Sequence, residues 1–352
     1  MTHSRPITRR GMLALAGALL GAAPLATSGC ARDRVERTKD RPATGSTFAF
    51  DTYCTFTVYG DDTAVGALTR ACAHYDRLFD LYAPESDIAR INAAGGASCP
   101  VDAATIELVK EGLDFSSRSN GLFDITIGAV STLWDFHEGV RPDDAAIAQA
   151  LACVDWRGVR VDEGARTVTL ENPHAKLDLG GIAKGFIADK LCRLLGKETA
   201  ATGASISLGG NVAFFGSKPD GTPWSGGIRD ANDPKADKVQ GTVKVDAGSL
   251  VTSGLYERTF TQDGTTYWHI LDPRTGMPVE TDIAGVTVYC PSSTAADALS
   301  TTLFVAGSKE GRSLAERTKD TAALFILQDG SRVQSPDWQT LTNYRARESS
   351  RP

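Results

Sequence analysis

The segment of residues 178–189, DLGGIAKGFIAD, constrains the fold of this chain more than any other stretch. Residues 176–179 alternate polar and apolar side chains, which is typical of a strand. Gly180 and Gly181 allow a tight turn and a close backbone approach, and apolar spacing over residues 183–195 predicts a helix. A glycine turn before a helix presents amide groups and a positive dipole end, which favour an anion. An ordinary strand-to-helix connection is the alternative, because the GxGxxG and Walker spacings are both missing.

The N-terminal segment predicts export and lipidation. Arg9 and Arg10 precede an apolar run over residues 12–25, which is shorter than a typical membrane span. The arginine pair is compatible with a twin-arginine signal, and the general secretory route is the alternative. Small residues before Cys30 resemble a bacterial lipobox, whereas a plain signal peptide would leave this cysteine incidental. We expect a signal peptide over residues 1–29, a lipid on Cys30 that anchors the exported protein to the extracytoplasmic face of the membrane, and a charged linker over residues 30–46.

Charge and cysteine content narrow the possible partners and chemistry. The chain has 37 basic and 43 acidic residues, a net charge of −6, and no basic cluster in its body, which argues against a nucleic-acid partner. The six cysteines after Cys30 show neither CxxC nor Cys/His metal spacing. An exported protein could pair them, and the sequence does not give a connectivity. Their positions in predicted helices and strands favour mostly buried free thiols.

Strand and helix patterns alternate along the rest of the chain, which predicts a mixed α+β class. No internal repeat is present. The predicted strands cover residues 47–59, 158–162, 166–171, 223–228, 240–246 and 283–290, with a further hairpin whose arms are 255–261 and 266–271. Residues 205–216 predict two more strands joined by a Gly-Gly bend. The predicted helices cover residues 61–80, 103–119, 143–153 and 292–305, with a short one near residue 90.

Several side chains outside the glycine segment are candidates for chemistry. Tyr82 lies on a loop edge, where an aromatic ring either fills the core or offers a stacking surface. His269 lies beside an Asp-Pro turn, where it either holds the turn or serves as an acid–base or phosphate-contacting group. Asp297 and Thr301 are four residues apart on a predicted helix and share a face. A carboxylate and a hydroxyl suit a hard cation such as magnesium, although an exposed polar face is the simpler interpretation.

Seven segments in order resemble the ApbE-type family of FAD:protein FMN transferases, over roughly residues 45–335. Two departures stand out: Phe50-Asp51-Thr52 replaces the usual Met-Gly-Thr, and Leu122 replaces a common Ala. The segments that carry the resemblance are Tyr82 with Ser86-Asp87-Ile88 and Asn92, GLFDITIG at 121–128, DLGGIAKG at 178–185, LGGN at 208–211, TSG at 252–254, HILDPRTG at 269–276 and DALST at 297–301.

The resemblance implies a fold and an activity. The fold is a single ApbE-like α+β domain with mixed or antiparallel strands, over residues 47–340, followed by a tail of residues 341–352. The activity is magnesium-dependent transfer of FMN from FAD to a threonine or serine hydroxyl of an exported target, through a phosphoester bond and with release of AMP. Targets in the family are typically membrane redox subunits or other exported flavoproteins. Hydrolysis of FAD to FMN and AMP is one alternative, and a flavin-binding lipoprotein without catalysis is another.

The resemblance also assigns roles to residues. It implies that the Gly181 carbonyl, Asp297 and Thr301 hold the metal, and Asp297 thereby counts as catalytic. His269 assists proton removal from the acceptor hydroxyl or orients the phosphate. Tyr82 stacks on the isoalloxazine ring. The residues implied to line FAD are Phe50, Tyr82, Leu122, Phe123, Asp124, Asp178, Lys184 and Leu271.

Overall fold

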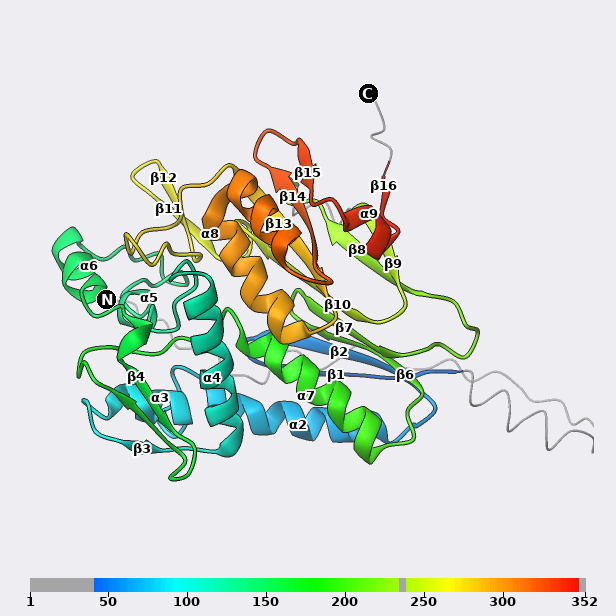
Figure 1. Cartoon of the computed structure of the whole chain (residues 1–352), viewed down its shortest axis with the longest axis horizontal. Helices are drawn as coiled ribbons and strands as arrows, with labels where there is room; N and C mark the ends of the chain where they lie inside the picture. Colours follow the sequence, from blue (N-terminus) through cyan, green and yellow to red (C-terminus); the bar gives the residue numbers. More distant parts are fainter. Residues whose placement is uncertain (1–40, 234–238, 348–352) are drawn as a thin grey trace, which may run out of the picture. The chain divides into compact units, whose positions relative to one another are not determined.

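An eight-stranded antiparallel sheet organises this computed structural model, which describes residues 41–233 and 239–347 (Figure 1). Successive side chains along a strand point to opposite faces. Nearly every residue of the central strands is buried, so these strands are covered on both faces. The predicted α+β class is confirmed. In spatial order the strands are β1 (Ala43–Ala49), β2 (Thr52–Tyr59), β6 (Gly203–Leu208), β7 (Asn211–Gly216), β10 (Gly248–Gly254), β13 (Ile283–Cys290), β14 (Ala322–Leu327) and β15 (Arg332–Gln334).

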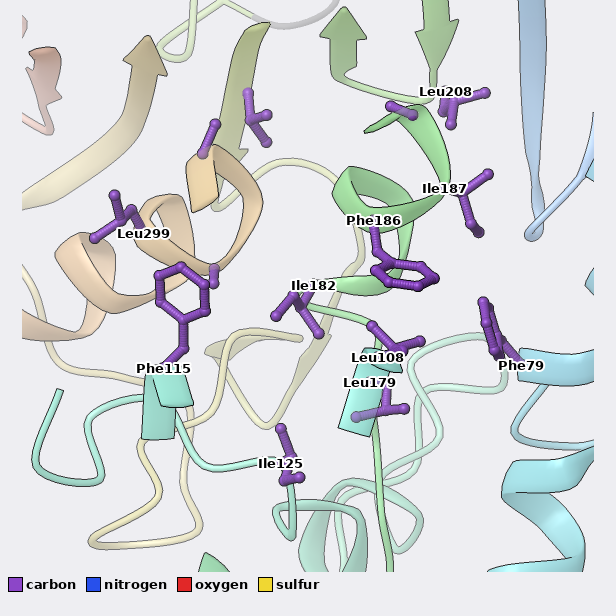
Figure 2. Packing of buried hydrophobic residues seen from close by; sticks show 14 of the residues in the cluster. Phe79, Leu108, Phe115, Ile125, Leu179, Ile182, Phe186, Ile187, Leu208 and Leu299 are labelled. Atoms are coloured by element: carbon purple, nitrogen blue, oxygen red, sulfur yellow. The ribbon is translucent and has the colours of Figure 1, made fainter. Parts of the chain in front are cut away.

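Helices cover one face of this sheet. They are α2 (Ala64–Phe79), α7 (Ala183–Glu198) and α8 (Ser293–Arg317), with α4 (Ala103–Arg118) packed against them (Figure 1). Figure 2 shows Ile182, just before α7, between Phe115 of α4 and Phe186 of α7, with Leu299 of α8 on the side of Phe115. The rings of Phe79 and Phe186 meet edge to face, with 6.0 Å between their centroids. This apolar layer fixes where the N-terminal end of α7 lies relative to α8.

A smaller sheet and a short helix cover part of the opposite face. Trp224 and Trp338 belong to the buried cluster between the two layers, together with Phe214 and Leu324 of the main sheet. The covering elements are β8 (Trp224–Arg229), β9 (Val239–Val245), β16 (Arg345–Ala346) and α9 (Trp338–Thr342).

The remaining elements lie around the N-terminal end of α7. Two units are prominent there. One is a three-stranded sheet of residues 99–100, 167–170 and 159–162, and the other is a hairpin of residues 259–262 and 265–268. Aromatic side chains of the hairpin pack on Trp134. The bounds are α3 (Asp87–Ala93), β3 (Cys99–Pro100), α5 (Gly128–Ser131), α6 (Asp144–Leu151), η1 (Trp156–Gly158), β4 (Val159–Asp162), β5 (Thr167–Leu170), β11 (Thr259–Gln262) and β12 (Thr265–Trp268).

The single strand predicted over residues 47–59 is wrong, because the chain reverses there. Phe50 and Asp51 form a two-residue turn between β1 and β2, with φ angles of 56° and 57°. Such turns favour Asn-Gly or Asp-Gly, so neither residue signals the reversal. The carboxylate of Asp76 on α2 accepts the Phe50 N–H at 2.7 Å and holds the turn. Strand β1 therefore begins at Ala43, inside the stretch predicted as linker.

The strand predicted before the glycine segment is also wrong. Lys176 makes an isolated bridge to Ile127, and no ladder follows. Instead the Asn92 side chain accepts the Leu177 N–H at 2.7 Å and donates to the Leu177 carbonyl at 2.9 Å. An amide side chain thus replaces a neighbouring strand, which the alternation of polar and apolar residues does not reveal.

The C-terminal third differs from the prediction in extent. Helix α8 continues to Arg317 through a kink at Gly307, where φ is 80°. Residues 345–346 pair with β9, and Tyr344 is buried, so part of the predicted tail belongs to the fold. Within the described residues no helix is long and apolar enough to cross a membrane. The predicted signal peptide and Cys30 lie outside the described ranges.

Candidate active site

Helices α7 and α8 cross at Gly185. The Gly185 N–H donates to Oδ2 of Asp297 at 2.8 Å. A Cβ at Gly185 would lie 2.2 Å from the Ser293 carbonyl oxygen and 2.6 Å from the Asp297 Cβ, so the helices approach this closely only because residue 185 is glycine. The crossing brings Asp297 to the first turn of α7, although 112 residues separate the two partners.

The start of α8 is fixed by Asp189 of α7. Its carboxylate accepts the N–H groups of Ser293 and Thr294, each at 2.9 Å. It also accepts the hydroxyls of Ser292 at 2.9 Å and Thr294 at 2.7 Å. Asp189 thus satisfies amides that a helix end leaves free and sets the position of Asp297 one turn later. The sequence assigned it no role, since its partners are more than 100 residues away.

Gly181 lies against Thr301 and Phe123. A Cβ at residue 181 would be 3.2 Å from Oγ1 of Thr301 and 3.0 Å from the Phe123 ring. The three residues predicted to hold a metal, Gly181, Asp297 and Thr301, therefore gather where α7 begins beside α8. Asp297 is 4% exposed, and burial raises its pKa, while the charge of Lys184 and the Gly185 amide act in the opposite direction.

This donor set fits magnesium. It offers one carboxylate, one hydroxyl and a backbone carbonyl, all hard oxygen donors. Within residues 41–233 and 239–347 no group of three His, Cys, Asp or Glu side chains could hold a metal. A cation here would therefore depend on a single carboxylate and on oxygens of the substrate, which is the usual way in which magnesium binds beside phosphates.

The amides at the start of α7 are mostly occupied. The N–H groups of Ile182 and Ala183 donate to the Leu179 carbonyl at 3.0 and 2.8 Å, and that of Gly185 binds Asp297. The prediction of free amides waiting for an anion is thus wrong for these three groups, because the Leu179 carbonyl accepts two of them and the Asp297 carboxylate accepts the third. Lys184 donates from Nζ to the Gly180 carbonyl at 3.1 Å.

Asp178 is held by three hydrogen bonds at the entrance of the glycine segment. Its Oδ2 accepts the Ser131 hydroxyl at 2.7 Å, and its Oδ1 accepts the Gly180 N–H at 2.9 Å. Its own N–H donates to the Ile125 carbonyl at 2.9 Å. Ser131, from the short helix α5, has no sequence signal that ties it to Asp178.

The turn Leu122–Asp124 follows α4 and reaches the same region. Oδ1 of Asp124 accepts the N–H and hydroxyl of Thr126 at 2.8 and 2.6 Å, and Oδ2 accepts the Trp156 N–H at 3.2 Å. Burial raises the pKa of Asp124, and the Thr126 hydrogen bonds oppose this shift. Its carboxylate therefore shapes the turn, which sets the Phe123 ring against Gly181 and leaves Leu122 half-buried.

His269 has one ring nitrogen without a protein partner. Its Nδ1 is shielded from solvent and makes no hydrogen bond to any described residue. Burial, together with the charges of Arg258 and Lys184, lowers the pKa of His269 to about 4, so the ring is neutral near pH 7. The backbone N–H of His269 donates to the Arg258 carbonyl at 3.2 Å, and the Arg258 guanidinium pairs with Asp51 at 3.0 Å. The sequence did not single out Arg258, because Asp51 is 207 residues away.

The Asp-Pro turn after His269 is well defined. The Asp272 N–H donates to the Met277 carbonyl at 2.8 Å, and the Asp272 carboxylate pairs with the Arg274 guanidinium at 2.7 Å. Leu271 is 7% exposed and packs beside Val130. This turn restricts the backbone beside His269, and Leu271 presents little side-chain surface to a ligand.

Tyr82 lies on the surface. Its side chain is 76% exposed, which excludes the core position considered from the sequence. Asp80 accepts the Tyr82 N–H at 2.8 Å and orders the loop. The pKa of the Tyr82 hydroxyl is raised, first by partial desolvation and next by the Asp178 carboxylate. The ring is thus open to a ligand.

A cavity of about 320 Å³ lies elsewhere, lined among others by Thr126, Asp155 and Glu171. None of the predicted site residues lines it. We therefore place the candidate site at the α7–α8 crossing and not in this cavity. Unlike the cavity, the crossing offers the buried carboxylate of Asp297, with the charge of Lys184 acting both on it and on His269.

Known proteins are similar to this chain in sequence and in fold. The ApbE family model matches residues 50–325. An FAD:protein FMN transferase of Treponema pallidum (strain Nichols) is 39% identical over 261 residues, which are 70% of this chain and 72% of that protein. One of Klebsiella pneumoniae (strain 342) is 34% identical over 278 residues, 77% of this chain and 85% of that protein. The crystal structure of the ApbE protein of Thermotoga maritima matches with a TM-score of 0.78 and 30% identity, covering 86% of this chain and 99% of its own.

Proposed function

The chain belongs to the ApbE family and is an FAD:protein FMN transferase, and we propose that it uses magnesium to move FMN from FAD onto a threonine or serine hydroxyl of an exported acceptor. In this reaction the hydroxyl oxygen attacks the FMN phosphorus. A phosphoester bond forms, the pyrophosphate bond breaks, and AMP leaves. The observation that carries the proposal is the convergence of Gly181, Thr301 and Asp297 at the α7–α8 crossing.

We assign magnesium binding to the Gly181 carbonyl, the Thr301 hydroxyl and the Asp297 carboxylate. When bound, magnesium neutralises negative charge that develops on the pyrophosphate oxygens. The surrounding residues keep this carboxylate in place: the Gly185 amide binds it, and Asp189 fixes the helix that carries it. Lys184 adds a positive charge close to Asp297 and His269.

His269 is proposed to take the proton of the acceptor hydroxyl. Its Nδ1 has no described protein partner, and the ring is neutral near pH 7. A pKa of about 4 makes a weak base in the free protein. Two causes of this low pKa are the positive charges of Arg258 and Lys184. An anionic pyrophosphate bound near them would offset these charges. Substrate binding would therefore raise the pKa of His269 and make it a better base.

The flavin half of FAD is proposed to lie against Tyr82. Its exposed ring gives the stacking surface, and Asp178, held by Ser131 and Gly180, offers a fixed carboxylate to the ligand. Phe50 and Leu122 are half-buried at the tips of two turns and complete the lining. We further propose that a lipid on Cys30 anchors the protein at the extracytoplasmic membrane face, where exported acceptors such as membrane redox subunits are found.

The test is an intact-mass assay. Purified protein is incubated with FAD, magnesium chloride and a candidate exported acceptor, and both the acceptor mass and AMP are measured. We expect the acceptor to gain the mass of FMN with one AMP per transfer, and Asp297→Asn to suppress both signals. AMP and free FMN without an acceptor adduct, for every acceptor tried, would indicate FAD hydrolysis instead. FAD binding with no AMP at all would contradict catalysis.

A further inference from the structure

Arg258 and Asp51 form an exposed ion pair between two hairpins that are distant in sequence. Nη2 of Arg258 lies 3.0 Å from Oδ2 of Asp51, and the two side chains are 56% and 79% exposed. Arg258 directly precedes β11, and Asp51 lies at the tip of the β1–β2 hairpin. Within the residues that the structure describes, Asp51 is the one carboxylate that pairs with Arg258. Because water screens both charges, such a pair contributes little stability and is readily exchanged for a stronger partner.

The side chains of Arg258 and His269 start from the same face of the β11–β12 hairpin. Thr259 pairs with Trp268 in the ladder, and the backbone N–H of His269 donates to the Arg258 carbonyl at 3.2 Å. The pairing thus continues by one residue and places Arg258 opposite His269. Opposite residues of an antiparallel pair have Cβ atoms about 4.5–5.5 Å apart, with both side chains on one face. The guanidinium that pairs with Asp51 therefore belongs to the residue next to the imidazole.

The position of Asp51 is set by its turn and not by Arg258. Asp51 has a φ of 57°, and the Asp76 carboxylate accepts the N–H of the preceding Phe50 at 2.7 Å. Among the described residues, the Asp51 carboxylate accepts a side-chain hydrogen bond from Arg258 alone. Arg258 can therefore leave Asp51 without breaking the contact that holds the turn.

A second cation acts on His269 from the first turn of α7. Lys184 donates from Nζ to the Gly180 carbonyl at 3.1 Å, and its charge, like that of Arg258, lowers the pKa of His269. Over residues 41–233 and 239–347 Lys184 forms no ion pair, and Arg258 forms only the exposed one. Two positive charges on different elements thus act on one buried imidazole, and neither is neutralised by a buried carboxylate in contact with it. This arrangement favours an anion that carries several charges.

We propose that Arg258 exchanges Asp51 for the pyrophosphate of FAD, so that Asp51 competes with the substrate for the guanidinium. The proposal rests on the proposed FMN transfer and adds to that site a phosphate-binding residue and a competitor within the same chain. In the free protein the Asp51 carboxylate holds the guanidinium at the hairpin tip. When FAD binds, a phosphate takes the place of the carboxylate. Phosphate oxygens accept two parallel hydrogen bonds from a guanidinium, and the pyrophosphate carries more negative charge than one carboxylate.

The exchange predicts opposite effects for the two side chains. Loss of the Arg258 charge removes a contact to FAD, so FAD binds more weakly. Loss of the Asp51 charge removes the competitor, so FAD binds more tightly. A carboxylate that merely repels the phosphates of FAD would also weaken binding, but it would do so whether or not Arg258 is present. The combination of both substitutions therefore distinguishes exchange from simple repulsion.

The first experiment is a double-mutant cycle of FAD binding, measured by fluorescence titration with magnesium chloride and without an acceptor. We expect Asp51→Asn to bind FAD about 2- to 5-fold more tightly than the parent, in line with the loss of an exposed ion pair. Arg258→Gln should bind FAD on the order of 10-fold more weakly, as for a lost hydrogen bond to a charged group. The double variant should bind as Arg258→Gln does. Unchanged affinity in either single variant, or an equal gain from Asp51→Asn in both backgrounds, would overturn the proposal.

The second experiment locates the effect at the phosphates. Riboflavin has the ring system of FAD and no phosphate, so Arg258→Gln should bind riboflavin as the parent does. Equal weakening for riboflavin and FAD would show that Arg258 supports the flavin pocket instead. Arg258→Lys keeps the charge and loses the planar fork, so its FAD affinity should lie between those of the parent and Arg258→Gln. The matched control is Arg160→Gln, because Arg160 is 59% exposed and pairs with Glu171 at 2.8 Å, and it should bind FAD as the parent does.

These measurements are independent of transfer to an acceptor. If the parent binds FAD and forms no acceptor adduct, the proposed FMN transfer fails, while the binding cycle still tests the exchange. If the adduct forms and FAD affinity does not depend on Arg258, the exchange alone is refuted. Thermal unfolding of each variant verifies the fold, and the exposed Arg258 side chain leaves no cavity when it is replaced.

Discussion

The backbone amide of Gly185 donates a 2.8 Å hydrogen bond to Oδ2 of Asp297, and this contact joins the two helices that build the candidate site. It places a carboxylate at the positive end of α7, which is the favourable position for a negative charge. Burial opposes that charge and raises the pKa of Asp297. A cation beside the carboxylate would offset the cost of burial.

Replacement of Asp297 by Asn should remove the charge and keep the shape. We expect FMN transfer and AMP release to fall on the order of 100-fold, because charge stabilisation at the phosphates is lost. Parent activity should also disappear in excess chelator and return with magnesium. Glu310→Gln, an exposed residue of the same helix, is the control and should retain activity. Full activity of Asp297→Asn, or of the parent in chelator, contradicts the proposed metal site.

Replacement of His269 by Ala should separate its two possible roles. A base lowers turnover and leaves FAD affinity near that of the parent, whereas a ground-state phosphate contact lowers affinity and spares saturated turnover. We expect the first result. Exposed His137 provides the control, and His137→Ala should change neither quantity. If His269→Ala keeps both its FAD affinity and its transfer rate, the histidine only supports the turn.

The pH dependence of the parent should reflect the lowered pKa of His269. The value of about 4 means that the ring keeps its base form across the neutral range and is protonated only as the pH falls towards 4. The acidic limb of kcat/KM, which reports the free enzyme, should therefore lie well below the ordinary histidine value of about 6.5. The measurement is a pH profile of AMP release at low FAD, with His269→Ala as the reference. An acidic limb near 6.5 in the parent would contradict this environment of the histidine.

Replacement of Tyr82 by Ala should weaken FAD binding and spare the fold. The side chain is 76% exposed, so its removal leaves no cavity. Loss of one aromatic stacking contact should reduce affinity by about 1 kcal/mol. Fluorescence titration with FAD measures the affinity, and thermal unfolding measures the stability. Tyr53 is 64% exposed on β2 and provides the matched control, so Tyr53→Ala should bind FAD as the parent does. Unchanged FAD affinity in Tyr82→Ala, with or without a fall in Tm, would reject the stacking role.

Glycine at position 51 should suit the hairpin turn better than any other small residue. Asp51 has a φ of 57°, a region that costs residues with a Cβ roughly 1 kcal/mol or more. Asp51→Gly and Asp51→Ala both lose the exposed pair with Arg258, so their comparison isolates the backbone effect. We expect Asp51→Gly to be about 1 kcal/mol more stable than Asp51→Ala in denaturant unfolding. Equal stabilities would show that the turn changes conformation.

Local patterns determined much of this protein. Apolar residues at helical spacing gave α4 and α7 to within a few residues, because a helix that packs on one face must repeat its apolar side chains along the chain. The strand predicted over residues 283–290 is confirmed as β13, and the order of short motifs identified the family. The residues proposed for the metal were named through that resemblance, because the seven motifs are specific only when they occur together in order.

Tertiary structure decided the features that depend on distant partners. The Phe50–Asp51 turn lacks the Asn-Gly or Asp-Gly pair typical of such turns and is held by Asp76 of the next helix. The Asp124 carboxylate, expected to face FAD, is engaged by Thr126 and Trp156. The spacing of apolar residues along the chain determines which face of a helix or strand is buried. The residues that this face contacts are determined only when the whole apolar core has packed.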